Sequence, residues 1–237
     1  MTGMPVSLGA ATISVPLRWA ARKGSAVAHL VGADCPEWTS VAIRDLRPTQ
    51  MTVGYREVAE KRRRWRAAHA TGEERAFRHR IVPVVLGPSA HPYVLDRHHW
   101  LCALAAEGVA EVPVVVVDDL GAFDRAAFWR TLNWRGWCRP CDAEGRRRDH
   151  GDIPSLIAER QDDPFRSLAS SLRRAGGYAK VHGPFSEFLW ADFLRHRIPR
   201  KLVVDDFEAA LRAALELSRI VGPNGVVDDG PDQLRYS

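Results

Sequence analysis

Apolar and polar positions follow strand-like patterns in several stretches of the first half of the chain. Residues 39–46 (TSVAIRDL) alternate as a short strand does, and residues 80–88 (RIVPVVLGP) predict a strand that ends in a Gly-Pro turn. Residues 92–96 (PYVLD) are the expected hairpin partner of that strand. The nearly continuous apolar run at 111–120 (EVPVVVVDDL) is typical of a strand buried on both faces. Together these stretches predict a small sheet.

Two stretches with helical spacing lie between these strands. Residues 54–72 carry apolar side chains at helical spacing and a strongly basic polar face, and residues 98–108 (HHWLCALAAEG) are rich in Ala and Leu up to Gly108, where the helix should stop. A strand, a helix and a strand within about 25 residues form a compact crossover, which is right-handed by the general rule. Residues 39–121 are therefore expected to form a small α/β (α+β) domain with a mixed sheet.

The second half of the chain is predicted to be helical, with little strand after Leu120. Breaks are expected at Gly176-Gly177 and at Pro199. Helical periodicity covers residues 122–136, 154–177, 185–198 and 206–222. The predicted organisation is an N-terminal extension at 1–38, the α/β domain at 39–121 and a helical region at 122–237.

The composition of the 237 residues is that of a globular protein, with 46% hydrophobic and 27% charged residues. The net charge of +5 tolerates a polyanionic partner such as a nucleotide or nucleic acid. No stretch approaches the ~20 apolar residues that span a bilayer, and the N-terminus has no signal-peptide pattern. We therefore expect a cytoplasmic protein with no membrane partner.

The sequence VLDRHHWLCAL places three polar side chains where a predicted strand becomes a helix. The first N–H groups of a helix and the positive end of its dipole favour anions, and two histidines, His98 and His99, can add hydrogen-bond donors there. Arg97 adds a fixed positive charge. Asp96 can orient a histidine, help to hold Mg²⁺ or cap the helix. An anion site and a merely structural arrangement are both open from spacing alone.

The chain resembles the ParB-like domain of the ParB/sulfiredoxin superfamily. The arrangement "LD.HH", "AL...G" and "VPV.VV" carries the resemblance, together with the upstream DLRPTQ and VPVVL. More narrowly, the chain resembles the group described as putative ParB-like nucleases, through FWRTLNWRGW and PFSEFLWADFLR, so that the likeness covers residues 39–198. It is also similar to the free-serine kinases of this fold.

The resemblance implies that nucleotide phosphates lie over the turn at residues 96–99. Asp96, His98 and His99 match the family pattern, whereas Arg97 stands where a glycine is usual and Trp100 where an arginine often stands. Asp96 is the expected Mg²⁺ ligand, and Arg97, His98, His99 and Lys61 are the expected ligands of ATP, ADP or CTP. Gln50 replaces the glutamate base of the kinases; it cannot take a proton but can position a hydroxyl group or water.

The leading hypothesis is Mg²⁺-dependent phosphotransfer to an unknown small-molecule acceptor, or hydrolysis of a nucleoside triphosphate. The first alternative is a ParB-like nuclease or DNA-binding protein. A two-metal nuclease needs clustered carboxylates, for which Asp96 and Asp118-Asp119 are the candidates, and the basic run KRRRWR at 61–66 could meet nucleic acid. The second alternative is a ligand-binding module without catalysis. The Cys138–Cys141 pair is interpreted as incidental, because a structural zinc site needs four ligands.

Overall fold

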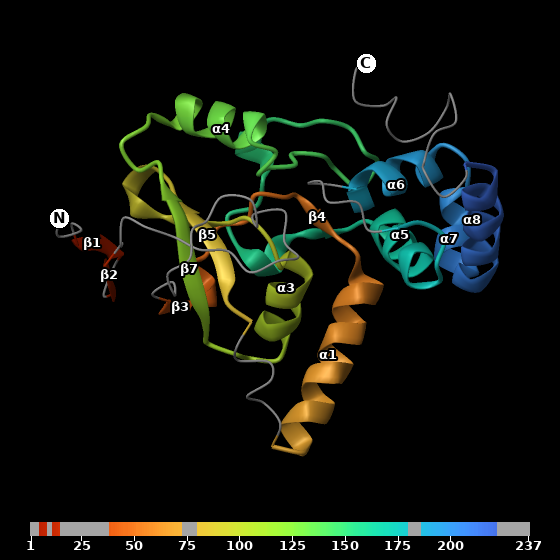
Figure 1. The fold of residues 1–237 in the computed structure, drawn as a ribbon, viewed down its shortest axis with the longest axis horizontal. Coiled ribbons are helices and arrows are strands. Elements are labelled where there is room, and N and C mark those ends of the chain that lie inside the picture. The colour runs from red at the N-terminus through yellow and green to blue at the C-terminus, as the bar shows by residue number, and fades with distance from the viewer. Residues whose placement is uncertain (1–4, 9–10, 15–37, 73–79, 180–185, 222–237) are drawn as a thin grey trace. The chain divides into compact units, whose positions relative to one another are not determined.

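The computed structural model describes residues 5–8, 11–14, 38–72, 80–179 and 186–221 (Figure 1). Most of the predicted N-terminal extension lies outside the described residues, apart from a hairpin of β1 (Pro5–Leu8) and β2 (Ala11–Ser14). The chain forms two compact units that interleave along the sequence. The first unit comprises residues 1–51, 58–140 and 148–160, and the second comprises residues 52–57, 141–147 and 161–237.

The first unit is built on a four-stranded mixed sheet with the order β3-β7-β5-β6. Its strands are β3 (Thr39–Ala42), β5 (Val82–Leu86), β6 (Pro92–Val94) and β7 (Glu111–Asp119). β7 pairs parallel with β5 and antiparallel with β3, and β5 and β6 form the expected antiparallel hairpin. The mixed sheet with helices confirms the α+β class. The first predicted strand is shorter than expected, because the chain turns into the 3₁₀ helix η1 (Ile43–Asp45).

Among the described residues of the first unit, three stretches are α-helical. They are α1 (Tyr55–Ala70), of which the first turn belongs to the second unit, α3 (His98–Ala106) and α4 (Arg125–Trp134). Short 3₁₀ helices complete the unit: η2 (Pro88–Ala90), η3 (His150–Asp152) and η4 (Ile157–Glu159).

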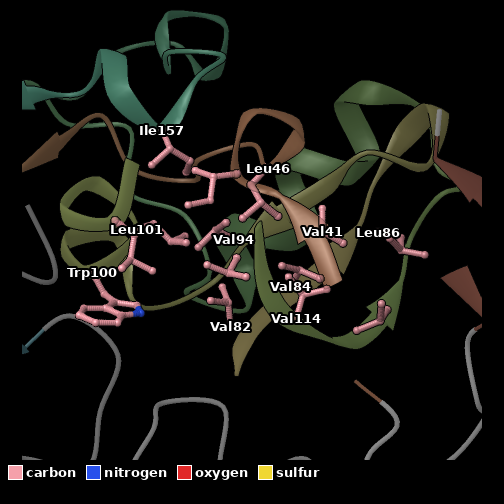
Figure 2. Close-up of a cluster of buried hydrophobic side chains, with 14 residues drawn as sticks. Val41, Leu46, Val82, Val84, Leu86, Val94, Trp100, Leu101, Val114 and Ile157 are labelled. Atoms are coloured by element: carbon pink, nitrogen blue, oxygen red, sulfur yellow. The ribbon is translucent and has the colours of Figure 1, made fainter. Parts of the chain in front are cut away.

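Two hydrophobic clusters stabilise this unit. In the first, Trp100 and Leu101 of α3 pack towards Val82, Val84 and the other buried valines of the sheet (Figure 2). Complete burial of a side chain such as Leu101 contributes roughly 1.5–3 kcal/mol. The second cluster joins α4 to the sheet through Phe128, Trp129, Leu132 and Val85. α3 and α4 are thus each fixed to the sheet by their own apolar faces.

The second unit contains the remaining helices and a two-stranded ladder. The helices are α5 (Pro164–Arg174), α6 (Ser186–Arg195), α7 (Arg200–Asp205) and α8 (Phe207–Val221). They share one core that includes Phe165, Leu168, Trp190 and Leu194. The strands β4 (Thr52–Val53) and β8 (Gln161–Asp162) pair in parallel.

The prediction of one helix over 154–177 is wrong in its first part. This stretch holds η4 and β8 before α5 begins at Pro164. Proline favours the first position of a helix, and the side chain of Asp163 caps the helix by accepting a hydrogen bond from the N–H of Phe165. The short helix α7 was not predicted. No helix among the described residues is both long and apolar enough to cross a membrane.

Candidate functional site

The turn between β6 and α3 has a left-handed backbone at Arg97. The φ and ψ angles of this residue are 69° and 24°, and it occupies the N-cap position of α3. The N–H of Arg97 donates to Oδ1 of Asp96 over 2.6 Å, and the carbonyl of Arg97 accepts from the N–H of Leu101 over 2.9 Å. This is the position where the family resemblance leads one to expect glycine, and the positive φ explains that preference. Here an arginine adopts the same conformation.

The turn carries concentrated positive charge. Partial burial lowers the pKa of Arg97, and the nearby charge of Arg80 lowers it further, whereas Asp96 opposes both effects. The guanidinium of Arg80 lies 5.4 Å from the centroid of the Trp100 ring, on the first turn of α3. Because the two guanidinium groups repel each other, an anion bound beside them would lower the free energy of the charged site.

Both histidines lie in the first turn of α3, and both are buried. His98 is 3% exposed, and its Nε2 lies 3.4 Å from the backbone N and from Oγ1 of Thr49. The hydroxyl of Thr49 donates to the carbonyl of Val94 over 2.7 Å. The loop at residues 47–50 is therefore held against both the end of β6 and the start of α3.

A buried arginine supports the first turn from the other side. Arg160 is 1% exposed, and its Nη2 donates to the carbonyl of His98 over 2.9 Å and contacts Sγ of Cys102 at 3.0 Å. Sequence reasoning missed Arg160, Arg80 and Thr49 as site residues. Thr49 precedes Gln50 in the quoted loop and could have been included, whereas nothing local marks residue 160, which lies 62 positions from His98.

The other predicted ligands lie at different distances from the turn. Gln50 is buried next to Thr49 and forms an isolated bridge with Arg139. Lys61 lies on α1 directly before Arg62, which pairs with Glu107 at 2.5 Å. Glu107 follows the last residue of α3, so its contact with Arg62 lies at the C-terminal end of this nine-residue helix. The turn lies at the N-terminal end, about 13 Å from that contact at 1.5 Å per residue. Arg66 also pairs with Glu107, at 2.6 Å, so part of the basic face of α1 is neutralised.

Carboxylates do not cluster around the turn. Among the described residues, no group of three or more His, Cys, Asp or Glu side chains is placed to hold a metal ion. Asp118 pairs with Arg135, and Oδ1 of Asp119 accepts from the N–H of Gly121 over 2.8 Å. Asp96 is exposed. One carboxylate fits Mg²⁺ that arrives on a nucleotide, because that ion takes few protein ligands and keeps phosphate oxygens and waters.

Among the described residues, no disulfide joins Cys102, Cys138 and Cys141. Cys138 is buried, whereas Cys141 and Cys102 are half-buried. Cys138 and Cys141 belong to different compact units.

The family comparison assigns this mixed sheet and its helices to a ParB-like domain. The chain belongs to the family described as putative ParB-like nucleases, whose model matches residues 39–196. It is similar to protein Atu1540 from Agrobacterium tumefaciens, a crystal structure with 48% sequence identity and a TM-score of 0.71. That alignment covers 77% of this chain and 92% of Atu1540. No curated protein matches the chain.

Proposed function

We propose that this ParB-like protein binds a nucleoside phosphate at the turn formed by residues 96–99. The observation that carries the proposal is the positive charge of Arg97 and Arg80 at the N-terminal end of α3. A helix N-terminus already favours anions, and two guanidinium groups add charge-assisted hydrogen-bond donors. His99, in the first turn, is the histidine proposed to face the phosphates.

The proposed chemistry is transfer of a phosphoryl group to a small-molecule acceptor, or to water, with Mg²⁺ bound. Asp96 would supply the protein oxygen to the metal, which neutralises charge on the phosphates. Arg97 would stabilise the additional charge of the transition state. Gln50 would orient the attacking hydroxyl or water, and Thr49 and His98 would fix the position of its loop.

Calorimetric titration with ATP, ADP and CTP, each with and without Mg²⁺, tests the binding. We expect Arg97→Gly and His99→Ala to weaken binding at least about tenfold, because each removes a hydrogen-bond donor to a charged group. Arg63→Gln is the matched control for charge, since Arg63 is exposed on α1. Wild-type affinity in both turn variants would refute the site.

Release of phosphate from the nucleotide that binds then separates the catalytic proposal from a ligand-binding module. Turnover that depends on Mg²⁺ and falls in Asp96→Asn and Gln50→Ala supports phosphotransfer. Tight nucleotide binding without release of phosphate, in the presence or absence of candidate acceptors, would show that the protein is a ligand-binding module and not a catalyst.

The family description favours nucleic-acid cleavage as the second candidate function. In that reaction the same turn would bind a phosphodiester group, with Asp96 holding the metal. Plasmid and single-stranded DNA are incubated with Mg²⁺ or Mn²⁺ for this test. Cleavage by the wild type that Asp96→Asn abolishes would place nuclease activity ahead of phosphotransfer; intact DNA with both proteins would reject it.

A further inference from the structure

A hollow on α4 is lined in part by two arginines and shares no lining residue with the turn at 96–99. It is lined by Arg125, Ala126, Trp129 and Arg130 of α4 and by His150 of η3. Its volume is about 390 Å³, which falls within the ~300–1,000 Å³ of typical small-molecule sites. All five residues belong to the first compact unit, so the hollow is formed within one unit.

The two arginines of the hollow are exposed and carry unneutralised charge. Among the described residues, neither Arg125 nor Arg130 has an ion-pair partner. The aspartates that flank the lining residues accept hydrogen bonds from backbone N–H groups and keep their negative charge. Asp124 accepts from the N–H of Ala127 over 2.7 Å, and Asp149 and Asp152 form the capping box of η3. Because no described carboxylate pairs with them, both guanidinium groups are available to donate charge-assisted hydrogen bonds to a phosphate.

The wall and the rim of the hollow are aromatic. The His150 ring stacks on Trp129 with a centroid distance of 5.0 Å and an interplanar angle of 17°. Trp134 lies one helical turn after Arg130 and is 85% exposed. Residues four apart on a helix lie side by side, so Trp134 extends the surface that Arg130 begins. An exposed indole beside cationic groups is a stacking platform for nucleic-acid bases.

We propose that the α4 hollow is a phosphate-binding site for a ligand made of nucleotide units, separate from the turn at residues 96–99. Arg125 and Arg130 bind the phosphate in the hollow, and Trp134 stacks on a base that lies outside it. The phosphate can belong to a free nucleotide or to a single strand of nucleic acid. Trp134 separates these sources, because the base of a single nucleotide is present in both, whereas a neighbouring base is present only in a strand.

Binding is measured on the full chain at low salt, by fluorescence polarisation with a labelled ten-nucleotide oligodeoxythymidylate and by calorimetry with CMP. We expect Arg125→Gln/Arg130→Gln to weaken binding of at least one probe by about tenfold or more, because two charged hydrogen-bond donors are lost. The control is Arg63→Gln/Arg212→Gln, which removes the same charge from two exposed arginines elsewhere. It should retain affinity to within about twofold, as expected of exposed charges that do not line the hollow.

Trp134→Ala then identifies the source of the phosphate. A loss of oligonucleotide affinity with unchanged CMP affinity assigns the site to a strand, an equal loss with both probes assigns it to a free nucleotide, and unchanged affinity for both removes Trp134 from the site. The proposal is overturned if the wild type binds neither probe, or if the double variant and its control behave alike. An equal loss in His99→Ala would show that the probes bind at the turn, whereas retained binding in that variant keeps the two sites distinct.

Discussion

The backbone of Arg97 makes the turn before α3 a strained position. A left-handed conformation costs a residue with a Cβ atom about 1–2 kcal/mol, whereas glycine adopts it freely. The structure therefore retains at this position a side chain that its φ angle of 69° disfavours. A charged group that contacts a ligand is one reason to retain it, and this is the residue on which the proposed site depends most.

We expect Arg97→Gly to be more stable than Arg97→Ala by about 1 kcal/mol. Both variants lose the same charge, and they differ in whether the new residue tolerates the positive φ. Urea unfolding followed by circular dichroism gives the two free energies of unfolding. Equal stabilities, or a more stable alanine variant, would mean that residue 97 is not left-handed in solution.

Thr49 and Arg160 show why only part of the site could be predicted. Asp96, Arg97, His98 and His99 are consecutive, so a pattern in the sequence brings them to notice. Thr49 and Arg160 reach His98 from 49 and 62 positions away. Such contacts follow from how the sheet and η4 pack, and no local pattern encodes them.

At the scale of the element, the start of α3 depends on the guanidinium of Arg160. Its contacts with the carbonyl of His98 and with Cys102 tie the first and second turns of the helix to the segment that follows η4. A buried carbonyl that loses its donor costs about 1–3 kcal/mol. Arg160 therefore acts as a positioning residue for the turn.

We expect Arg160→Met to accelerate amide hydrogen exchange at the start of α3, because the variant keeps apolar volume but loses every donor. Cys102→Ala is the matched control: it removes one contact of Arg160 and retains the bond to His98. Its effect on residues 98–101 should be smaller. If both variants exchanged like the wild type, the helix start would not depend on Arg160, and unchanged nucleotide affinity in Arg160→Met would remove its positioning role.

The start of α5 shows how element boundaries follow from single residues. Asp163 caps this helix and pairs with Arg195, whose Nη2 lies 2.5 Å from its Oδ2. Burial raises the pKa of Asp163, and the charges of Arg195 and Arg166 oppose that rise. The sequence Asp-Asp-Pro could have marked this start, because proline at the first helical position commonly follows a capping aspartate.

The raised pKa of Asp163 predicts a pH dependence of stability. Between its ordinary value of 3.8 and its higher value in the folded chain, the folded state binds more protons than the unfolded state. The stability of the wild type relative to Asp163→Asn should therefore fall as pH rises through that interval and become constant above it. Asparagine keeps the cap, so urea unfolding of the two proteins from pH 4 to 7 reports the titration.

Arg195→Met tests the cause of this pH dependence. Removing the guanidinium takes away a charge that lowers the pKa of Asp163, so the interval should extend to higher pH. A difference between wild type and Asp163→Asn that stayed constant with pH would contradict the burial effect. A difference that increased with pH would mean that folding lowers the pKa of Asp163 instead of raising it.

At the scale of the whole molecule, the sheet was easier to predict than the division into units. The apolar runs at 82–86 and 111–119 are buried strands, and their length and composition predict them from the sequence. The units, however, consist of interleaved segments, in which residues 52–57 join residues 161–237 through the β4–β8 ladder. Pairing between two-residue strands 109 positions apart leaves no periodic pattern in the sequence.

The two units should differ in how they respond to cavities in their cores. Leu101 of α3 and Leu194 of α6 are both fully buried, in separate hydrophobic clusters. Replacing either by alanine removes the same volume and costs about 2–5 kcal/mol. Cooperative units open as wholes, so the loss of protection from exchange should follow the unit that carries the cavity.

We therefore expect Leu194→Ala to lower the protection of α5, α6, α7 and α8 more than that of β5 and β7, and Leu101→Ala to do the reverse. Each variant is the control for the other, because it leaves the core of the other unit intact. Peptide-resolved hydrogen exchange under native conditions makes the comparison. If each variant lowered protection equally in both units, the interleaved segments would form a single cooperative unit, and the proposed nucleotide site could not be altered independently of the helical core.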